Sequence, residues 1–274
     1  MNNVQFVDPR KTVEVILPDG RTIQADRGSS LESILRILAD TESLPIVGAI
    51  VNGQLRELTY PVQMDAMVRP INMGDKDGVR IYRRSLTFLL SVAFQQLYPE
   101  GVLTVDHAVA SGGYYCQVEG LKKFTLKDVE KLEKHMRSLV SKNLRFERKE
   151  VLLSEAIDYF RTKNQSDKVD LLKYRTKPYL VLYQLGDHRD YHHGYMVPSS
   201  GYLKYFKLVR ANDESFILQY PRQSSPTEIQ KLPDNPKLLG TFTQYGSWLK
   251  KLGIENVGEL NNAITENKIR ELIL

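Results

Sequence analysis

The chain has 274 residues, of which 42% are hydrophobic and 26% charged, as in ordinary globular proteins, and it is long enough for about two domains. No apolar run approaches the roughly 20 residues of a membrane-spanning helix. The first residues lack the basic start and apolar stretch of a signal peptide. The single cysteine, Cys116, excludes an internal disulfide framework and a cysteine-based zinc ribbon. We therefore expect a cytoplasmic protein with no membrane partner.

The positive charge is concentrated in the middle of the chain. Residues 81–210 carry 22 lysines and arginines against 14 acidic residues, whereas residues 1–80 and 211–274 are slightly acidic. An excess of this kind attracts polyanions such as RNA. A solvated basic face without a partner explains the same counts, so charge alone leaves both interpretations open.

The first part of the chain has the pattern of two hairpins around one helix. Residues 13–25 alternate about a Pro-Asp-Gly turn and predict the first hairpin. Ser29 and Glu32 have the spacing of a capping box, and the apolar residues that follow them have helical spacing. Further strands are predicted at residues 46–51, 55–58 and 67–71, with an Asn-Gly turn at 52–53. Two hairpins around one helix make a β-grasp pattern.

The next part mixes helices and strands. After a charged, turn-rich hinge at 75–78, Ser85 is placed to cap a helix that Pro99 ends. Thr125 is placed to cap an amphipathic helix, and Ser154 to begin another. Strands are predicted at residues 113–118, 179–183 and 202–208, a polar, histidine-rich loop at 187–201, a linker at 224–236, and short helices at 242–252 and 257–274.

These patterns resemble a known pair of domains. Residues 15–20, the helix after Ser29 and residues 51–53 resemble the TGS domain, a β-grasp module found in threonyl-tRNA synthetases and in some GTPases and kinases. The second part resembles the α+β editing domain (the second additional domain) of threonyl-tRNA synthetase at residues 78–85, 113–115, 124–133, 167–169 and 197–201. The resemblance implies an α+β chain with a TGS domain at 1–79, an editing-like domain at 80–222 and a helical linker at 223–274.

The resemblance also assigns four positions to a metal-binding quartet that serves the hydrolysis of mischarged seryl-tRNA. In this chain those positions hold Arg84, Phe88, His192 and Met196. Only His192 carries a good zinc donor, because a guanidinium stays protonated, a phenyl ring has no donor atom and a thioether binds zinc poorly. We therefore expect no zinc or other cofactor here, and no enzyme-like hydrolysis of seryl-tRNA.

Other pocket residues of that family persist. Lys168 and Asp190 fall on its lysine and aspartate, and two tyrosines fall on its aromatic segment. One interpretation is that these residues only stabilise the fold through hydrogen bonds. In the other, Arg84 supplies a fixed positive charge to an anion such as a phosphate of tRNA. The candidate ligand-binding residues are Arg84, Tyr114, Tyr115, Lys168, Asp190, His192 and His193.

The end of the chain resembles a different group of proteins. Residues 202–208 and 216–221 resemble bacterial uridine kinase-related proteins, in which a TGS domain and a degenerate editing-like domain precede a P-loop kinase. No Gly-x4-Gly-Lys-Ser/Thr motif occurs here, so ATP and magnesium would belong to a nucleoside kinase domain beyond residue 274. Residues 270–274 keep a helical pattern, and we expect the polypeptide to continue.

The resulting functional hypothesis is a non-catalytic binding or regulatory module at the N-terminus of a uridine kinase-like protein. Its partners would be tRNA, another RNA or a phosphorylated small molecule, together with its own kinase domain. Two alternatives stay open. One is a metal-independent aminoacyl-tRNA deacylase that uses His192, Asp190 and Lys168, and the other is a purely structural or dimerising module.

Overall fold

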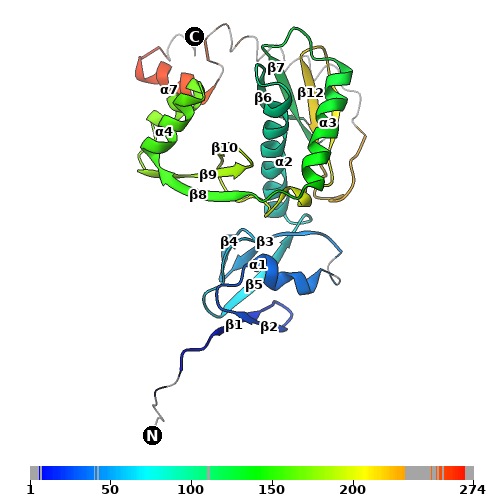
Figure 1. Cartoon of the computed structure of the whole chain (residues 1–274), viewed down its shortest axis with the longest axis vertical. Helices are drawn as coiled ribbons and strands as arrows, with labels where there is room; N and C mark the ends of the chain where they lie inside the picture. The colour runs from blue at the N-terminus through cyan, green and yellow to red at the C-terminus, as the bar shows by residue number, and fades with distance from the viewer. Residues whose placement is uncertain are drawn as a thin grey trace. The chain divides into compact units, whose positions relative to one another are not determined.

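The computed structural model describes residues 6, 8–39, 41, 43–109, 112–231, 248, 251, 253–254 and 256–268. The chain is α+β, as predicted, and its described residues form three separate sheets (Figure 1). It divides into two interleaved compact units. The first comprises Met1–Glu147, Leu185–His188 and His193–Lys231, and the second comprises Arg148–Gln184, Arg189–His192 and Leu232–Leu274. None of the helices in the described part of the chain has the length and apolar character of a membrane-spanning segment.

The first unit begins with a five-stranded sheet in the order β2-β1-β5-β3-β4. Strands β1 and β5 run parallel, and the two hairpins are antiparallel. The short helix α1 (Leu31–Leu35) continues as a 3-10 turn, η1 (Arg36–Leu38), and shares one apolar core with the sheet. This arrangement confirms the β-grasp prediction. The strands are β1 (Thr12–Ile16), β2 (Thr22–Asp26), β3 (Ile46–Val51), β4 (Gln54–Arg56) and β5 (Ala66–Asn72).

The predicted capping box at the start of α1 is wrong. Ser30, not Ser29, is the N-cap, and its side chain accepts the Ser33 N–H at 3.2 Å. The Glu32 carboxylate does not turn back to the cap, because it binds side chains far along the chain. Ser29 and Ser30 were both possible N-caps. The chain uses Ser30, and the Glu32 side chain is then available for its distant partners.

The predicted hinge at 75–78 is also wrong, because α2 (Lys76–Leu97) begins inside it with Asp75 as the N-cap. Gly78 lies in the first turn for a steric reason: a Cβ there would fall 1.9 Å from the carbonyl oxygen of Asn72. Ser85 therefore caps nothing. It lies inside α2, and its hydroxyl donates to the Ile81 carbonyl at 2.8 Å. The helix does end just before Pro99, as predicted.

A four-stranded antiparallel sheet in the order β11-β12-β7-β6 completes the first unit. Helix α3 (Leu126–Ser141) starts at Thr125, as predicted, with a capping box to Asp128. The Phe94 ring of α2 contacts the ring of Phe124, which in turn contacts that of Phe216 on β12. These contacts join α2 to the sheet. The strands are β6 (Val102–Val109), β7 (Gly113–Glu119), β11 (Lys207–Arg210) and β12 (Ser215–Gln219), and between them lies a 3-10 turn, η2 (Ser200–Tyr202).

The second unit is built on a three-stranded sheet in the order β10-β9-β8. Its apolar core includes Phe160 from α4, Leu172 from α5 and Leu182 from β9. The elements are β8 (Glu147–Leu152), α4 (Leu153–Thr162), α5 (Ser166–Lys173), β9 (Tyr179–Leu185), β10 (His188–Tyr191) and α7 (Val257–Thr265). The predicted loop at 187–201 thus begins with a strand. Of the predicted linker at 224–236, residues 224–231 belong to no helix or strand. Residues 232–236 lie outside the described residues, as does most of the predicted helix at 242–252.

Candidate functional site

The junction between α2 and residues 193–197 lies at the positions that the resemblance assigned to a metal site. One guanidinium nitrogen of Arg84 donates to the Tyr195 carbonyl oxygen at 2.5 Å. The guanidinium lies so close to Gly194 that a Cβ there would fall 2.8 Å from Arg84 Cζ, and Gly194 has φ +91°. Ser85 Oγ accepts the Val197 N–H at 2.9 Å. Two polar contacts therefore fasten the loop to the helix.

Two other positions of the quartet belong to the apolar core. Phe88 is 0% exposed and Met196 is 1% exposed. The Phe88 ring meets the rings of Phe146 and His188 edge to face, with centroids 5.7 Å and 5.3 Å away. Core packing, rather than ligation, occupies these side chains.

The donor set does not fit zinc. Arg84, Phe88 and Met196 offer a cation, a hydrocarbon ring and a thioether, which leaves His192 as the one good zinc donor of the four. Within the part of the chain that the structure describes, no group of three or more His, Cys, Asp or Glu side chains is placed to hold a metal ion. The expectation that the chain carries no zinc stays a prediction.

Tyr114 and Tyr115 are neighbours on β7, so they project to opposite faces of the sheet. The Tyr114 ring lies 5.1 Å from that of Tyr220, whose hydroxyl accepts a hydrogen bond from Arg83 at 3.3 Å. Burial raises the pKa of Tyr220. Tyr115 is buried on the other face, where its hydroxyl lies 2.7 Å from Ser215 Oγ. The two tyrosines therefore face different surroundings.

Lys168 and Asp190 form an ion pair in the second unit. Their Nζ and Oδ2 atoms are 2.7 Å apart, and the side chains are 24% and 13% exposed. The ammonium also lies 5.2 Å from the centre of the Phe160 ring. The second carboxylate oxygen accepts the Tyr191 N–H at 2.7 Å. Lys168 and Asp190 thus form a close ion pair, and a role of either residue in ligand binding stays a prediction.

The seven candidate residues fall into both units. The second unit holds Lys168, Asp190 and the half-buried His192, and Lys168 and Asp190 are in direct contact. The first unit holds Arg84, Tyr114, Tyr115 and the exposed His193. Within the first unit, Arg84 and the two tyrosines have the separate partners described above.

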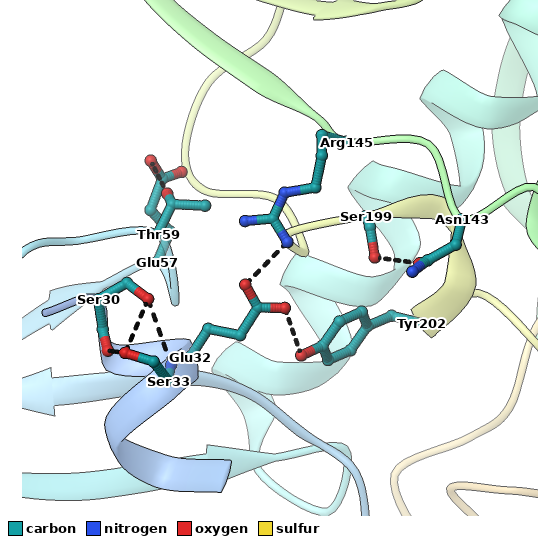
Figure 2. Close-up of polar contacts among 9 residues, drawn as sticks. All are labelled: Ser30, Glu32, Ser33, Glu57, Thr59, Asn143, Arg145, Ser199 and Tyr202. Carbon is teal, nitrogen blue, oxygen red and sulfur yellow. Dashed lines mark hydrogen bonds and ion pairs between the residues drawn. The ribbon is translucent and has the colours of Figure 1, made fainter.

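Sequence reasoning missed a polar network around Glu32. One Glu32 oxygen lies 2.8 Å from an Arg145 guanidinium nitrogen, and the other accepts the Tyr202 hydroxyl at 3.1 Å (Figure 2). Beside it, Ser199 Oγ donates to Asn143 Oδ1 at 2.6 Å. Burial, followed by the nearby Glu32 charge, raises the pKa of Tyr202. No local pattern could reveal this network, because Glu32 and its partners are 113 and 170 residues apart.

Cys116 is buried in β7 and is expected to be unreactive in the folded chain. Burial raises the pKa of its thiol to about 12. The reactive species is the thiolate, which at pH 8.5 would be roughly one in 3,000 molecules, against about half for an ordinary cysteine. We expect iodoacetamide to alkylate the native chain at least about 100-fold more slowly than the chain unfolded in urea. Equal rates in the two states at pH 8.5 would show that the thiol is accessible and ionised.

Comparison with known proteins gives one consistent result. No family model matches the chain. A threonine–tRNA ligase of Clostridium kluyveri is 32% identical over 239 residues, which cover 82% of this chain and 37% of the relative. The Thermotoga maritima ligase is 31% identical over 199 residues (72% and 30%), and threonine–tRNA ligase 2 of Bacillus subtilis is 29% identical over 203 residues (74% and 32%).

The chain thus spans about a third of the length of the curated relatives that it matches. The matched part covers most of the chain, and each of these relatives is a threonine–tRNA ligase. The predicted resemblance to threonyl-tRNA synthetase is therefore confirmed as a similarity over roughly three quarters of the chain.

Proposed function

We propose that this chain is a tRNA-binding module that lacks the hydrolytic chemistry of an editing domain. One observation carries the proposal. The similarity to threonine–tRNA ligases covers 82% of the chain, yet the positions that would hold a metal are filled by an arginine and two core side chains. A fold does not imply its chemistry, so the similarity does not argue for hydrolysis when the metal-binding groups are missing.

The residues left in the pocket do not supply an obvious base. Hydrolysis of an aminoacyl ester needs an activated water, which a metal or a general base provides. Both oxygens of Asp190 already accept hydrogen bonds, one from Lys168 and one from the Tyr191 N–H. This arrangement speaks against the alternative of a metal-independent deacylase.

Arg84 is the residue through which we propose that the module binds phosphate. A guanidinium stays charged at every working pH, and its planar fork of N–H donors matches the oxygens of a phosphate; one of these donors binds the Tyr195 carbonyl oxygen. Arg84 lies in the segment 81–210, where basic residues outnumber acidic ones by 22 to 14. The same guanidinium also binds the main chain of the loop at 193–197. Its removal can therefore weaken tRNA binding by loss of a phosphate contact or by displacement of this loop.

The test is fluorescence anisotropy with labelled tRNA from 50 to 200 mM KCl. We expect affinity to fall steeply with salt, since neutralised phosphates release counterions. Arg84→Ala should weaken binding roughly tenfold or more, the scale of one charge-assisted contact. The matched control is Arg80→Ala, one turn earlier on α2 and paired with Asp77, which should change affinity less than about twofold.

The salt dependence separates the two roles of Arg84. A lost phosphate contact lowers the slope of log K against log salt by about 1, whereas a displaced loop leaves it nearly unchanged. If affinity depends on neither salt nor Arg84, the proposal of tRNA binding fails, and the alternative of a purely structural or dimerising module remains. Binding of a phosphorylated small molecule in place of tRNA would identify the other class of ligand.

A deacylation assay with seryl-tRNA completes the test. The wild-type chain should not deacylate seryl-tRNA faster than the uncatalysed reaction, and Asp190→Ala should leave this deacylation rate unchanged. Turnover that Asp190→Ala abolishes would overturn the proposal and establish the deacylase.

We further propose that the longer polypeptide is uridine kinase-like, with this module ahead of a P-loop kinase domain. The support is the resemblance of residues 202–208 and 216–221 to such proteins. The curated relatives described above are threonine–tRNA ligases, so the two contexts compete. The reading frame beyond Leu274 decides between them: a P-loop motif there supports the kinase, and a class II synthetase core contradicts it.

A further inference from the structure

A cavity of about 400 Å³ lies between the start of the β-grasp helix and the segment around Tyr202 and Tyr205, all within the first unit. This volume is in the range of small-molecule sites, which are usually concave, mostly apolar and equipped with a few polar groups. Neither the metal positions nor the Lys168–Asp190 pair lines it. The cavity is therefore a separate feature from the candidate tRNA site.

Most of the cavity wall is hydrocarbon. Its apolar lining consists of Leu35, Ala39, Leu44, Pro45, Ile46 and Leu58. Tyr202 and Tyr205 line it as well; Tyr202 is the last residue of η2, and Tyr205 lies three residues beyond it. A ligand that fills this space places an apolar body against this wall, because a polar group there would lose its hydration without gaining hydrogen bonds. Ser43 and Thr227 are the other polar residues of the lining.

The two charged residues of the lining, Glu32 and Arg36, differ in whether their side chains have a polar partner. The Glu32 carboxylate is already neutralised by Arg145 and bonded by the Tyr202 hydroxyl (Figure 2). The side chain of Arg36, four residues further along the chain, has no hydrogen-bond or ion-pair partner among the residues that the structure describes. The charge left for a ligand in the described lining is therefore a single guanidinium.

We propose that this cavity binds a small amphipathic monoanion, with its apolar body against Leu35, Ile46 and Leu58 and its carboxylate at Arg36. A carboxylate matches the fork of a guanidinium and forms the stronger, charge-assisted kind of hydrogen bond. The apolar body accounts for the remaining wall. The proposal does not depend on tRNA binding.

The experiment is an NMR titration of the full chain, labelled at Leu and Ile methyl groups, with 3-phenylpropanoate. Saturable shifts are expected at Leu35, Ile46 and Leu58, and none at Leu180 and Leu182 in the core of the second unit. The uncharged 3-phenylpropanamide has almost the same shape and should bind about tenfold more weakly. Octanoate is the second carboxylate, and weaker binding than that of the aromatic acid would show that the site prefers a planar body.

Two variants and a control locate the site. Arg36→Gln should reduce the preference for the acid over the amide from about tenfold to near one. Ala39→Phe should fill the cavity and abolish binding of both compounds. Arg27→Gln removes an exposed arginine of the same β-grasp unit and should leave both affinities unchanged.

Three results would each overturn the proposal. They are the absence of saturable shifts, equal affinity of wild type for acid and amide, and undiminished binding by Ala39→Phe. Methyl spectra of each free variant show whether it is folded, and Ser43→Trp on the same cavity wall replaces Ala39→Phe if that variant does not fold.

Discussion

Replacement of Phe88 by alanine is expected to lower the free energy of unfolding by about 3–5 kcal/mol. The ring is fully buried and meets the rings of Phe146 and His188, so its loss removes apolar burial and leaves a cavity. Urea denaturation followed by circular dichroism measures the change. Met67→Ala is the control, because Met67 is largely exposed on β5 and should cost less than about 0.5 kcal/mol.

The outcome bears directly on the metal question. Phe88→His places an imidazole at a position that the resemblance assigned to a metal ligand, but Arg84 and Met196 still supply no zinc donor. We expect this variant to be destabilised as well and to carry no zinc by elemental analysis. A stable Phe88→His protein with one zinc per chain would show that the remaining side chains suffice, and our assignment of Phe88 to the core would fail.

Replacement of Lys168 by methionine is expected to cost about 2–3 kcal/mol, less than for a fully buried pair because Lys168 is 24% exposed. The change leaves the Asp190 carboxylate, whose side chain is only 13% exposed, without its countercharge. Thermal and urea unfolding of the second unit measure it. The double variant Lys168→Met/Asp190→Leu should regain part of the loss, because it removes the uncompensated charge.

The control is Arg161→Met, since Arg161 forms an exposed pair with Asp158 and should cost less than about 1 kcal/mol. If Lys168→Met is as harmless as Arg161→Met, the pair does not stabilise the unit. Lys168 would then return as a candidate ligand-binding residue, to be tested in the tRNA assay.

The parts of the fold that sequence patterns predicted are those with local causes. The first hairpin forms at a Pro-Asp-Gly turn and the second at an Asn-Gly turn, and Thr125 caps α3 with Asp128 three residues later. Strand β6 was missed; its burial alternates along the strand, and a β-bulge shifts its register between Val105 and Ala108. The start of α2 was missed because Gly78 reads as a turn residue until Asn72 is seen beside it.

The candidate site was predicted only as a set of positions. Motif order places Arg84, Phe88 and Met196 where a metal quartet would be, and donor chemistry alone argues that zinc does not bind there. The sequence could not show that Arg84 binds a main-chain carbonyl 111 residues away, because side-chain partners at that separation depend on the folded chain. The Glu32 network was hidden for the same reason.

Tyr195 is held at both of its ends. Arg84 of α2 binds its carbonyl oxygen, and Arg56 of β4 lies 3.3 Å from its hydroxyl. The hydrogen bond to Tyr195 is also what raises the pKa of Arg56 most. Tyr195 therefore links the β-grasp sheet to the long helix α2 through one hydrogen bond at each of its ends. A displacement of β4 would therefore act on the main chain of residues 194–197 through the Tyr195 side chain.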